Sequence, residues 1–228
     1  NTDIGGFFAG AYNRGWNDGS GAKNPSFQEL YVRWPQFGTF TPMMRSHGTD
    51  IPREIYNFGK KGEPIYDAIV KSIHLRYSLL PYIYSAAWDI TNSQSTMMRA
   101  LVMDFKDAKV RDVNHEYMFG KSILVAPIVN AQYTPETIVK SDEQTGWDKK
   151  DASNDTKVQP VTFSEAKSTK VYLPEGTAWY DFWTNEKTNG GQEIAKATTI
   201  DEIPLYVKAG SIIPFGPQVQ YATEKKWD

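Results

Sequence analysis

The spacing of the hydrophobic positions changes once along the chain, near residue 95. Before that point, apolar side chains recur every three or four residues in two long segments, which is the period of an amphipathic helix. Beyond it, short apolar runs alternate with turn residues, which is typical of antiparallel strands. The pattern therefore predicts an α/β part before a boundary near residue 95 and an all-β part after it.

Two long helices are predicted in the first part. One begins at Asn24 or Ser26, either of which can cap a helix, and ends at Gly38. The other runs from residue 63 to about residue 92. Pro81 lies inside it and lacks a backbone donor, so we expect a kink or two separate helices there.

Shorter elements complete the prediction. Residues 1–24 are crowded with Gly, Asn and Asp and are expected to form a loop, and the apolar residues 39–44 are expected to form a strand before a polar turn. This order is that of an α/β unit. Further strands, in an antiparallel sandwich, are predicted over residues 100–105, 122–126, 170–173, 178–183, 203–207 and 211–213.

A polar and charged segment over about residues 140–170 interrupts the strands and is predicted to be a surface hairpin or insertion. Trp147 within it can touch a glycan or pin its own loop, and the second role is the simpler expectation. Aromatic residues make up 14% of the chain. So many aromatic rings indicate either a large hydrophobic core or flat surfaces on which sugar rings stack, and a role in the core is the simpler expectation.

Charge and composition exclude several classes of function. The 25 basic and 27 acidic residues give a net charge of −2, which leaves no basic field for nucleic acid or anionic lipid. No apolar run is long enough for a membrane-spanning helix, and the chain has no cysteine. The chain starts at Asn1 in a Gly-rich segment, with no signal peptide, and is expected to be a piece of a longer protein.

Two short segments carry candidate chemistry. Asp3, Gly5, Gly6 and Phe7 combine a carboxylate, backbone that can approach a ligand and a ring that can stack on a sugar; the alternative is a tight turn with an inward-packed ring.

Arg45 and His47 share a face if the backbone there is extended, and strand ends of α/β barrels are where sites are built. The alternative is a structural histidine beside an arginine that braces a loop. His74 and His115 are expected to be structural or exposed. The 3 histidines show no metal-binding spacing, and no cofactor fingerprint is present, so neither a metal nor a cofactor is expected.

Several strings, in order along nearly the whole chain, together resemble glycoside hydrolase family 31, the α-glucosidase and α-xylosidase family. They are DIGGF (3–7), ELYVRWPQFG (29–38), RSHG (45–48), LRYSLLPY (75–82), FGKSILVAP (119–127), VYLP (171–174), WYDFW (179–183) and IPLYVKAGSIIP (203–214). Through this resemblance, residues 1–94 are expected to be the last units of a (β/α)8 TIM barrel. Residues 95–217 are then its proximal antiparallel β-sandwich, and residues 218–228 begin a further module.

The resemblance also implies roles for residues. Phe7 is expected to line the −1 sugar subsite, and His47 to bond a sugar hydroxyl there. Asp3 and Arg45 are expected to form an ion pair at the barrel mouth that holds both loops in register. If that pair is partly buried, losing one member would be costly.

The mechanism implied by the family is retaining hydrolysis of an α-glycoside by two carboxylic acids. Both would lie upstream of Asn1, so no catalytic residue is assigned here and the chain alone is expected to be inactive. RSHG (45–48) followed by PREIYN (52–57) favours the α-xylosidase branch. The expected partner is an oligosaccharide or glycoside substrate.

A different interpretation remains open from the many rings and the predicted sandwich, namely a non-catalytic carbohydrate-binding or structural module. The two interpretations differ in their predictions, since a binding module needs an exposed row of rings. A half barrel leaves bare strand edges and apolar faces. We therefore expect the first 95 residues to be less stable than the sandwich, or to pair with a second copy.

Overall fold

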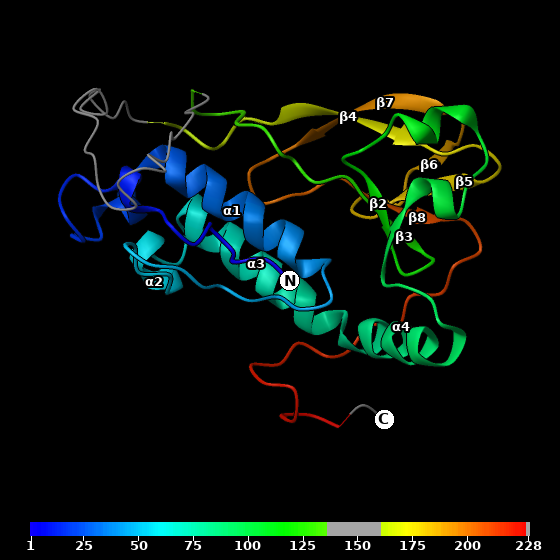
Figure 1. Cartoon of the computed structure of the whole chain (residues 1–228), viewed down its shortest axis with the longest axis horizontal. Coiled ribbons are helices and arrows are strands. Elements are labelled where there is room, and N and C mark those ends of the chain that lie inside the picture. The colour runs from blue at the N-terminus through cyan, green and yellow to red at the C-terminus, as the bar shows by residue number, and fades with distance from the viewer. Residues whose placement is uncertain (136–160, 227–228) are drawn as a thin grey trace, which may run out of the picture.

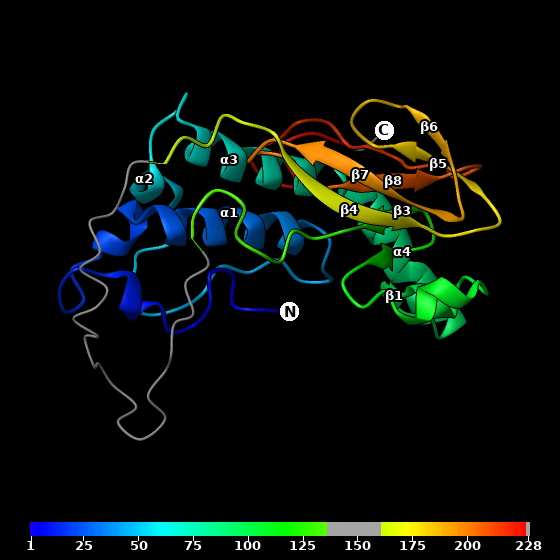
Figure 2. The ribbon, with the colours of Figure 1, turned by 90° about the horizontal axis from the view of Figure 1, so that it is seen from above.

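The computed structural model describes residues 1–135 and 161–226. Helices α1, α2 and α3 lie at one side of the molecule and the strands at the other, with α4 beneath the strands (Figure 1). Helices α1 and α3 lie side by side, and the strands continue beyond their ends (Figure 2). Trp147 and most of the predicted insertion lie outside the described residues.

The helices are α1 Pro25–Thr39, α2 Ile55–Phe58, α3 Pro64–Ser78 and α4 Leu80–Ser93, with 3₁₀ turns at η1 Gly10–Tyr12, η2 Ser20–Lys23, η3 Leu101–Met103 and η4 Ala108–Arg111. Helix α1 confirms the first prediction. The Asn24 Oδ1 atom accepts a hydrogen bond from the backbone N–H of Ser26 at 3.0 Å and so caps the helix. Pro25 takes the first helical position, where a missing N–H costs nothing.

The second predicted helix divides in two, as the proline indicated. Helix α3 ends at Ser78, and α4 begins directly after the buried Leu79, with Pro81 in its first turn. A proline in a first turn breaks no intrahelical hydrogen bond. The division therefore lets the chain change direction without losing backbone pairing.

The predicted strand over residues 39–44 is wrong. Helix α1 continues to Thr39, and the chain then bends. Arg76 of α3 donates hydrogen bonds of 2.5 to 3.0 Å to the carbonyl oxygens of Thr39, Thr41 and Pro42. A guanidinium from a helix thus takes the carbonyl oxygens that a neighbouring strand would need.

The strands are β1 Met98–Ala100, β2 Tyr117–Phe119, β3 Ile123–Val125, β4 Lys167–Leu173, β5 Ala178–Asp181, β6 Lys187–Asn189, β7 Gln192–Thr198 and β8 Leu205–Lys208. Over the residues that the structure describes, they form a 6-stranded sheet in the order β1-β2-β3-β8-β5-β6 and a 2-stranded sheet of β4 and β7. Every pair is antiparallel. The predicted fold class, α/β followed by an antiparallel β-sandwich, is confirmed.

Individual strands agree less completely with the prediction. Strands β3, β4, β5 and β8 fall on predicted runs, but the run over 100–105 turns into the 3₁₀ turn η3, and residues 211–213 form no strand. Strands β2, β6 and β7 were not predicted. In β7 only Thr198 is fully buried, and the other residues of the strand are half-buried or exposed.

Side chains of the larger sheet alternate between two cores. Met118 and Leu124 point toward the smaller sheet and pack with Trp179, whereas Phe119 and Ile123 point the other way, toward α4. The larger sheet is therefore covered on both faces. None of the described helices is long and apolar enough to cross a membrane.

Buried polar contacts join α1 to the β part. The Glu29 carboxylate is buried and accepts hydrogen bonds from the backbone N–H groups of Gln132, Tyr133 and Thr134. One turn later, Arg33 donates to the carbonyl oxygens of Ile200 and Glu202 at 3.3 and 3.0 Å. Burial lowers the pKa of Arg33 to about 10, so it remains charged at neutral pH. Helix α1 is thus fixed to the β part by charged side chains.

Candidate functional site

Two segments that are far apart in the sequence lie side by side where the candidate residues occur. Ile4 and Ser46 form a parallel backbone bridge, and the Ile4 N–H donates to the Arg45 carbonyl oxygen at 3.2 Å. Parallel pairing of neighbouring extended segments is the arrangement of strands in a barrel. It brings Asp3 and Phe7 next to Arg45 and His47.

The charged side chains of the two segments meet. Arg45 Nη2 donates to Asp3 Oδ1, and His47 Nδ1 lies 3.6 Å from the same oxygen. In the described chain, the Asp3 side chain is 29% exposed and that of Arg45 46%. Asp3 is therefore partly buried and Arg45 is exposed. An ion pair that solvent reaches on one side is worth about 1 kcal/mol.

Phe7 and His47 are neighbours. Their ring centroids are 5.4 Å apart with the planes tilted by 45°, and Phe8 stands edge-on to Phe7 at 4.8 Å. Phe7 is 37% exposed, so its ring is not packed inward as the alternative interpretation required. The two rings present an aromatic face and an imidazole to the same region of the surface.

Two glycines turn the chain so that Phe7 can take this position. Gly5 and Gly6 have φ of +89° and +76°, a region that residues with a Cβ rarely adopt. The Gly6 N–H closes the turn on the Asp3 carbonyl oxygen at 2.8 Å, and the Thr49 N–H holds the Phe7 carbonyl oxygen at 2.8 Å. The loop that carries the phenyl ring is therefore hydrogen-bonded at both ends.

Helix α1 supplies the support beneath these loops. The Tyr31 hydroxyl lies 2.8 Å from Ser46 Oγ and donates to the Arg53 carbonyl oxygen at 3.1 Å. The Trp34 indole N–H donates to Thr2 Oγ1 at 3.1 Å, and its ring lies 3.5 Å from where a Cβ of Gly6 would be. One face of α1 thus contacts the candidate site, while Glu29 and Arg33 contact the β part.

Arg53 belongs to this site, and sequence reasoning missed it. Its guanidinium donates to the carbonyl oxygens of Ile4 and Gly6, both at 2.7 Å. Its sequence neighbourhood, PREIYN (52–57), indicated only a branch of the family. No periodicity or motif identifies an arginine whose partners are backbone oxygens nearly fifty residues away.

The other histidines lie apart from the site. His74 is exposed on α3, and His115 is exposed just before β2. Over residues 1–135 and 161–226, no group of three or more His, Cys, Asp or Glu side chains is arranged to hold a metal ion.

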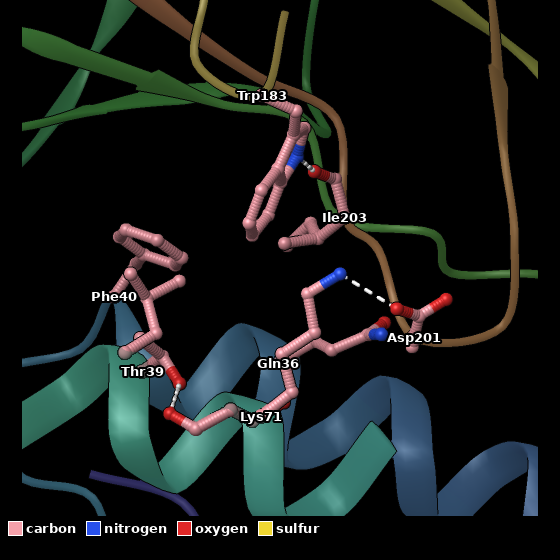
Figure 3. A pocket seen from close by; sticks show the side chains of 9 residues that line it. Gln36, Thr39, Phe40, Lys71, Trp183, Asp201 and Ile203 are labelled. Carbon is pink, nitrogen blue, oxygen red and sulfur yellow. Dashed lines mark hydrogen bonds and ion pairs between the residues drawn. The ribbon is translucent and has the colours of Figure 1, made fainter. Parts of the chain in front are cut away.

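Two cavities lie elsewhere in the described chain. The first, of about 10 Å³, lies between the helices and the β part, where Lys71 contacts Asp201 at 2.6 Å and Trp183 covers one side (Figure 3). That volume holds about one water molecule. The second, about 280 Å³, lies between α4 and the larger sheet and is lined by Tyr82, Lys121 and Ile212 among others. Neither includes Phe7 or His47.

Comparison with known proteins agrees with the geometry. Residues 1–86 match the family description of the glycosyl hydrolases family 31 TIM-barrel domain, and residues 94–147 and 157–213 match that of the glycosyl hydrolase family 31 C-terminal domain.

Full-length relatives and solved structures agree with these matches. An alpha-xylosidase of Saccharolobus solfataricus is 38% identical over 229 residues, covering 100% of this chain and 25% of the relative. A GH31 alpha-xylosidase structure from Xanthomonas citri has a TM-score of 0.75 and 38% identity, covering 97% of this chain and 20% of that one. A GH31 dextranase from Flavobacterium johnsoniae, complexed with glucose, has a TM-score of 0.71 and 32% identity, covering 98% and 22%. This chain therefore spans a quarter or less of the length of these proteins, and it belongs to glycoside hydrolase family 31.

Proposed function

We propose that this chain is the part of a retaining α-glycoside hydrolase that completes the catalytic barrel and adds the adjoining β domain. The observation that carries the proposal is the 5.4 Å separation of the Phe7 and His47 rings on two parallel-bridged segments. We place the boundary between the two domains near residue 95, and assign residues 218–228 to the start of a further module.

In this proposal Phe7 and His47 line the −1 subsite. A phenyl ring contacts the apolar face of a sugar, and a neutral imidazole can both donate to and accept from sugar hydroxyls. Asp3 and Arg45 hold the two loops in register, and Asp3 Oδ1 also lies 3.6 Å from His47 Nδ1.

The reaction needs two carboxyl groups. One attacks the anomeric carbon as the C–O bond to the leaving group breaks, and the other donates its proton to the leaving oxygen. The second group then takes a proton from water, whose oxygen displaces the enzyme carboxylate from the sugar. We assign neither group to this chain, and place both on barrel strands that precede DIGGF (3–7) in the complete protein.

The sugar that we propose is α-linked xylose. Support comes from RSHG (45–48) with PREIYN (52–57) and from the names of the relatives at 38% identity. Glucose carries an additional hydroxymethyl group, so a site shaped for xylose excludes it by volume.

The proposal is tested on the longer protein encoded by the reading frame upstream of Asn1. That frame should contain two Asp-bearing strand ends, and the protein should hydrolyse an aryl α-xyloside faster than an aryl α-glucoside. His47→Ala and Phe7→Ala should each lower kcat/KM by about 10- to 100-fold, because each removes contacts to the sugar.

His74→Ala is the matched control, since His74 is exposed on α3 and should leave kcat/KM unchanged. The 228-residue chain by itself should show no turnover and negligible xylose affinity by calorimetry. An unrelated domain upstream, or full activity of His47→Ala, would refute the proposal. Tight sugar binding by the chain alone would support a carbohydrate-binding module instead.

A further inference from the structure

We propose that Arg53 is a positioning residue that sets the geometry of the candidate sugar site by holding the loop of Phe7 and the loop of His47 together. The effect of Arg53 on catalysis rests on the proposed function. Its effect on the structure of the loops does not, and the two effects are tested separately.

The guanidinium bonds backbone from both loops. Nη1 donates to the Ile4 carbonyl oxygen and Nη2 to the Gly6 carbonyl oxygen, each at 2.7 Å, while Nε donates to the Ile51 carbonyl oxygen at 3.2 Å. Two of these acceptors flank the turn that leads into Phe7. Because the guanidinium is planar with fixed donor directions, it imposes the relative position of the oxygens it binds.

The loops are also closed tightly around it. A Cβ on Gly5 would lie 2.2 Å from Nη1, and a Cβ on Gly48 would lie 2.1 Å from Nη2 and 2.8 Å from the Gly6 carbonyl oxygen. Gly48 directly follows His47, so the guanidinium touches the backbone beside each of the proposed sugar-binding side chains. Two glycines on different loops are thus required by one side chain.

Aromatic rings of α1 fix the arginine from below. The guanidinium carbon lies 5.6 Å from the centroid of the Phe27 ring and 6.0 Å from that of Tyr31. Both rings belong to the buried core of the helical part. A lysine can supply the charge but neither the fork of donors nor the flat contact.

The structural test uses the 228-residue chain and amide hydrogen exchange. In Arg53→Gln the exchange of the Gly6 and Thr49 amides should rise at least about tenfold, since these N–H groups close the two loops on Asp3 and Phe7. Arg53→Lys should raise the exchange rates of the same amides by a smaller factor. It also provides a second variant for the test if Arg53→Gln does not fold. Unchanged exchange at both amides in either folded variant would overturn the inference.

Arg76→Gln is the matched control. Arg76 also donates to three backbone carbonyl oxygens, at the other end of the 39–47 segment. Its loss should accelerate exchange of the Phe40 and Thr41 amides, which bond to Phe37 and Gly38, and leave Gly6 and Thr49 protected. If Arg76→Gln deprotects those two amides as strongly as Arg53→Gln does, Arg53 has no specific role and the inference is wrong.

The catalytic test uses the longer protein. Arg53→Gln should lower kcat/KM by about 10- to 100-fold and weaken competitive inhibition by free xylose in the same proportion, with partial recovery in Arg53→Lys and little change in Arg76→Gln. An active wild-type protein whose Arg53→Gln variant keeps its kcat/KM would refute the positioning role. A wild-type protein without glycosidase activity would instead refute the proposed function, and the exchange data would still decide the role of Arg53.

Discussion

At the scale of single residues, the site depends on backbone shape as much as on side chains. Phe7 reaches the surface beside His47 because Gly5 and Gly6 adopt left-handed φ. Asp3 and Arg45 add charge, but Arg45 is exposed and Asp3 is only partly buried in this chain. The geometry of the loops therefore comes mainly from glycine and from the half-buried hydrogen bonds of Arg53.

Gly5→Ala tests this dependence on backbone shape. Its Cβ would lie 2.2 Å from Arg53 Nη1 and 2.7 Å from the Tyr31 ring, in addition to the strain of φ +89°. We expect a loss of about 2–4 kcal/mol in the free energy of unfolding. Gly62→Ala is the control, because Gly62 has φ +94° and no neighbouring atom within 4 Å, so it loses only about 1 kcal/mol. If Gly5→Ala and Gly62→Ala lower the free energy of unfolding equally in urea denaturation, the steric contacts of Gly5 do not contribute.

At the scale of elements, a buried carboxyl connects the two sheets. Glu116 directly precedes β2, and its Oε1 accepts the Tyr172 N–H of β4 at 2.9 Å. Its side chain is 1% exposed, and His115 Nε2, at the surface, lies 3.6 Å from the same Oε1. Burial, assisted by repulsion from Glu193 on β7, raises the pKa of Glu116 to about 7.

This raised pKa predicts a pH dependence of stability. The folded state keeps the Glu116 proton up to about pH 7, whereas the unfolded state loses it near the ordinary glutamate pKa of 4.5. The stability from this group is therefore fully present below pH 4.5 and is lost as the pH rises toward 7, by about 3 kcal/mol. Glu116→Gln should be more stable than wild type at about pH 8 and similar at about pH 4.5, measured by urea denaturation.

Glu175→Gln serves as the control for that experiment. Glu175 is exposed in the loop after β4, so its replacement should leave the pH dependence as in wild type. If the stability of Glu116→Gln changes with pH between about 5 and 8 as steeply as that of the wild type, the buried carboxyl is not the source of the pH dependence.

At the scale of the whole molecule, α1 serves both parts of the chain. Tyr31 and Trp34 contact the candidate site, and Glu29 and Arg33 contact the β part. The β part is thereby attached to the support of the site, even though Phe7 and His47 lie on other segments. Changes at this junction should propagate to stability of the whole chain.

Glu29→Ala tests the junction. It would leave the buried N–H and hydroxyl groups of Thr134, and the half-buried N–H groups of Gln132 and Tyr133, without their acceptor. Each buried polar group left unsatisfied costs about 1–3 kcal/mol. We expect a loss of at least about 3 kcal/mol in the free energy of unfolding, and faster amide exchange at residues 132–134. Glu29→Gln keeps one acceptor oxygen and should lose less. Equal stability of Glu29→Ala and wild type would show that the contacts are not strong.

The expectation that residues 1–95 are less stable than the β part, or pair with a second copy, remains a prediction at this scale. Tyr84 and Trp88 on α4 are 74% and 66% exposed, which is in keeping with apolar surface that has no partner within the described part of this chain. Hydrogen exchange of the dilute chain, compared between α4 and β3, measures the difference directly.

The parts of the fold that could be predicted are those encoded by neighbouring residues. Asn24 and Pro25 mark the start of α1, Pro81 marks the division between α3 and α4, and the apolar run at 122–126 marks β3. Strand β7 was missed because all but one of its residues are half-buried or exposed, so its sequence carries no apolar run. Residues 39–44 were misassigned because Arg76, from another element, takes their carbonyl oxygens.

By itself, the sequence determined the two-part architecture, the positions of the long helices and the family, because periodicity, caps and motif strings are properties of residues close together in the chain. It also identified Phe7 and His47 as candidates, but not their separation. Tertiary structure alone decided that these rings meet and that Arg53 binds Ile4 and Gly6. Contacts between residues so far apart in the sequence depend on how the segments pack. A guanidinium that donates to backbone oxygens requires no particular side chain in its partners. It requires only space, which Gly5 and Gly48 provide.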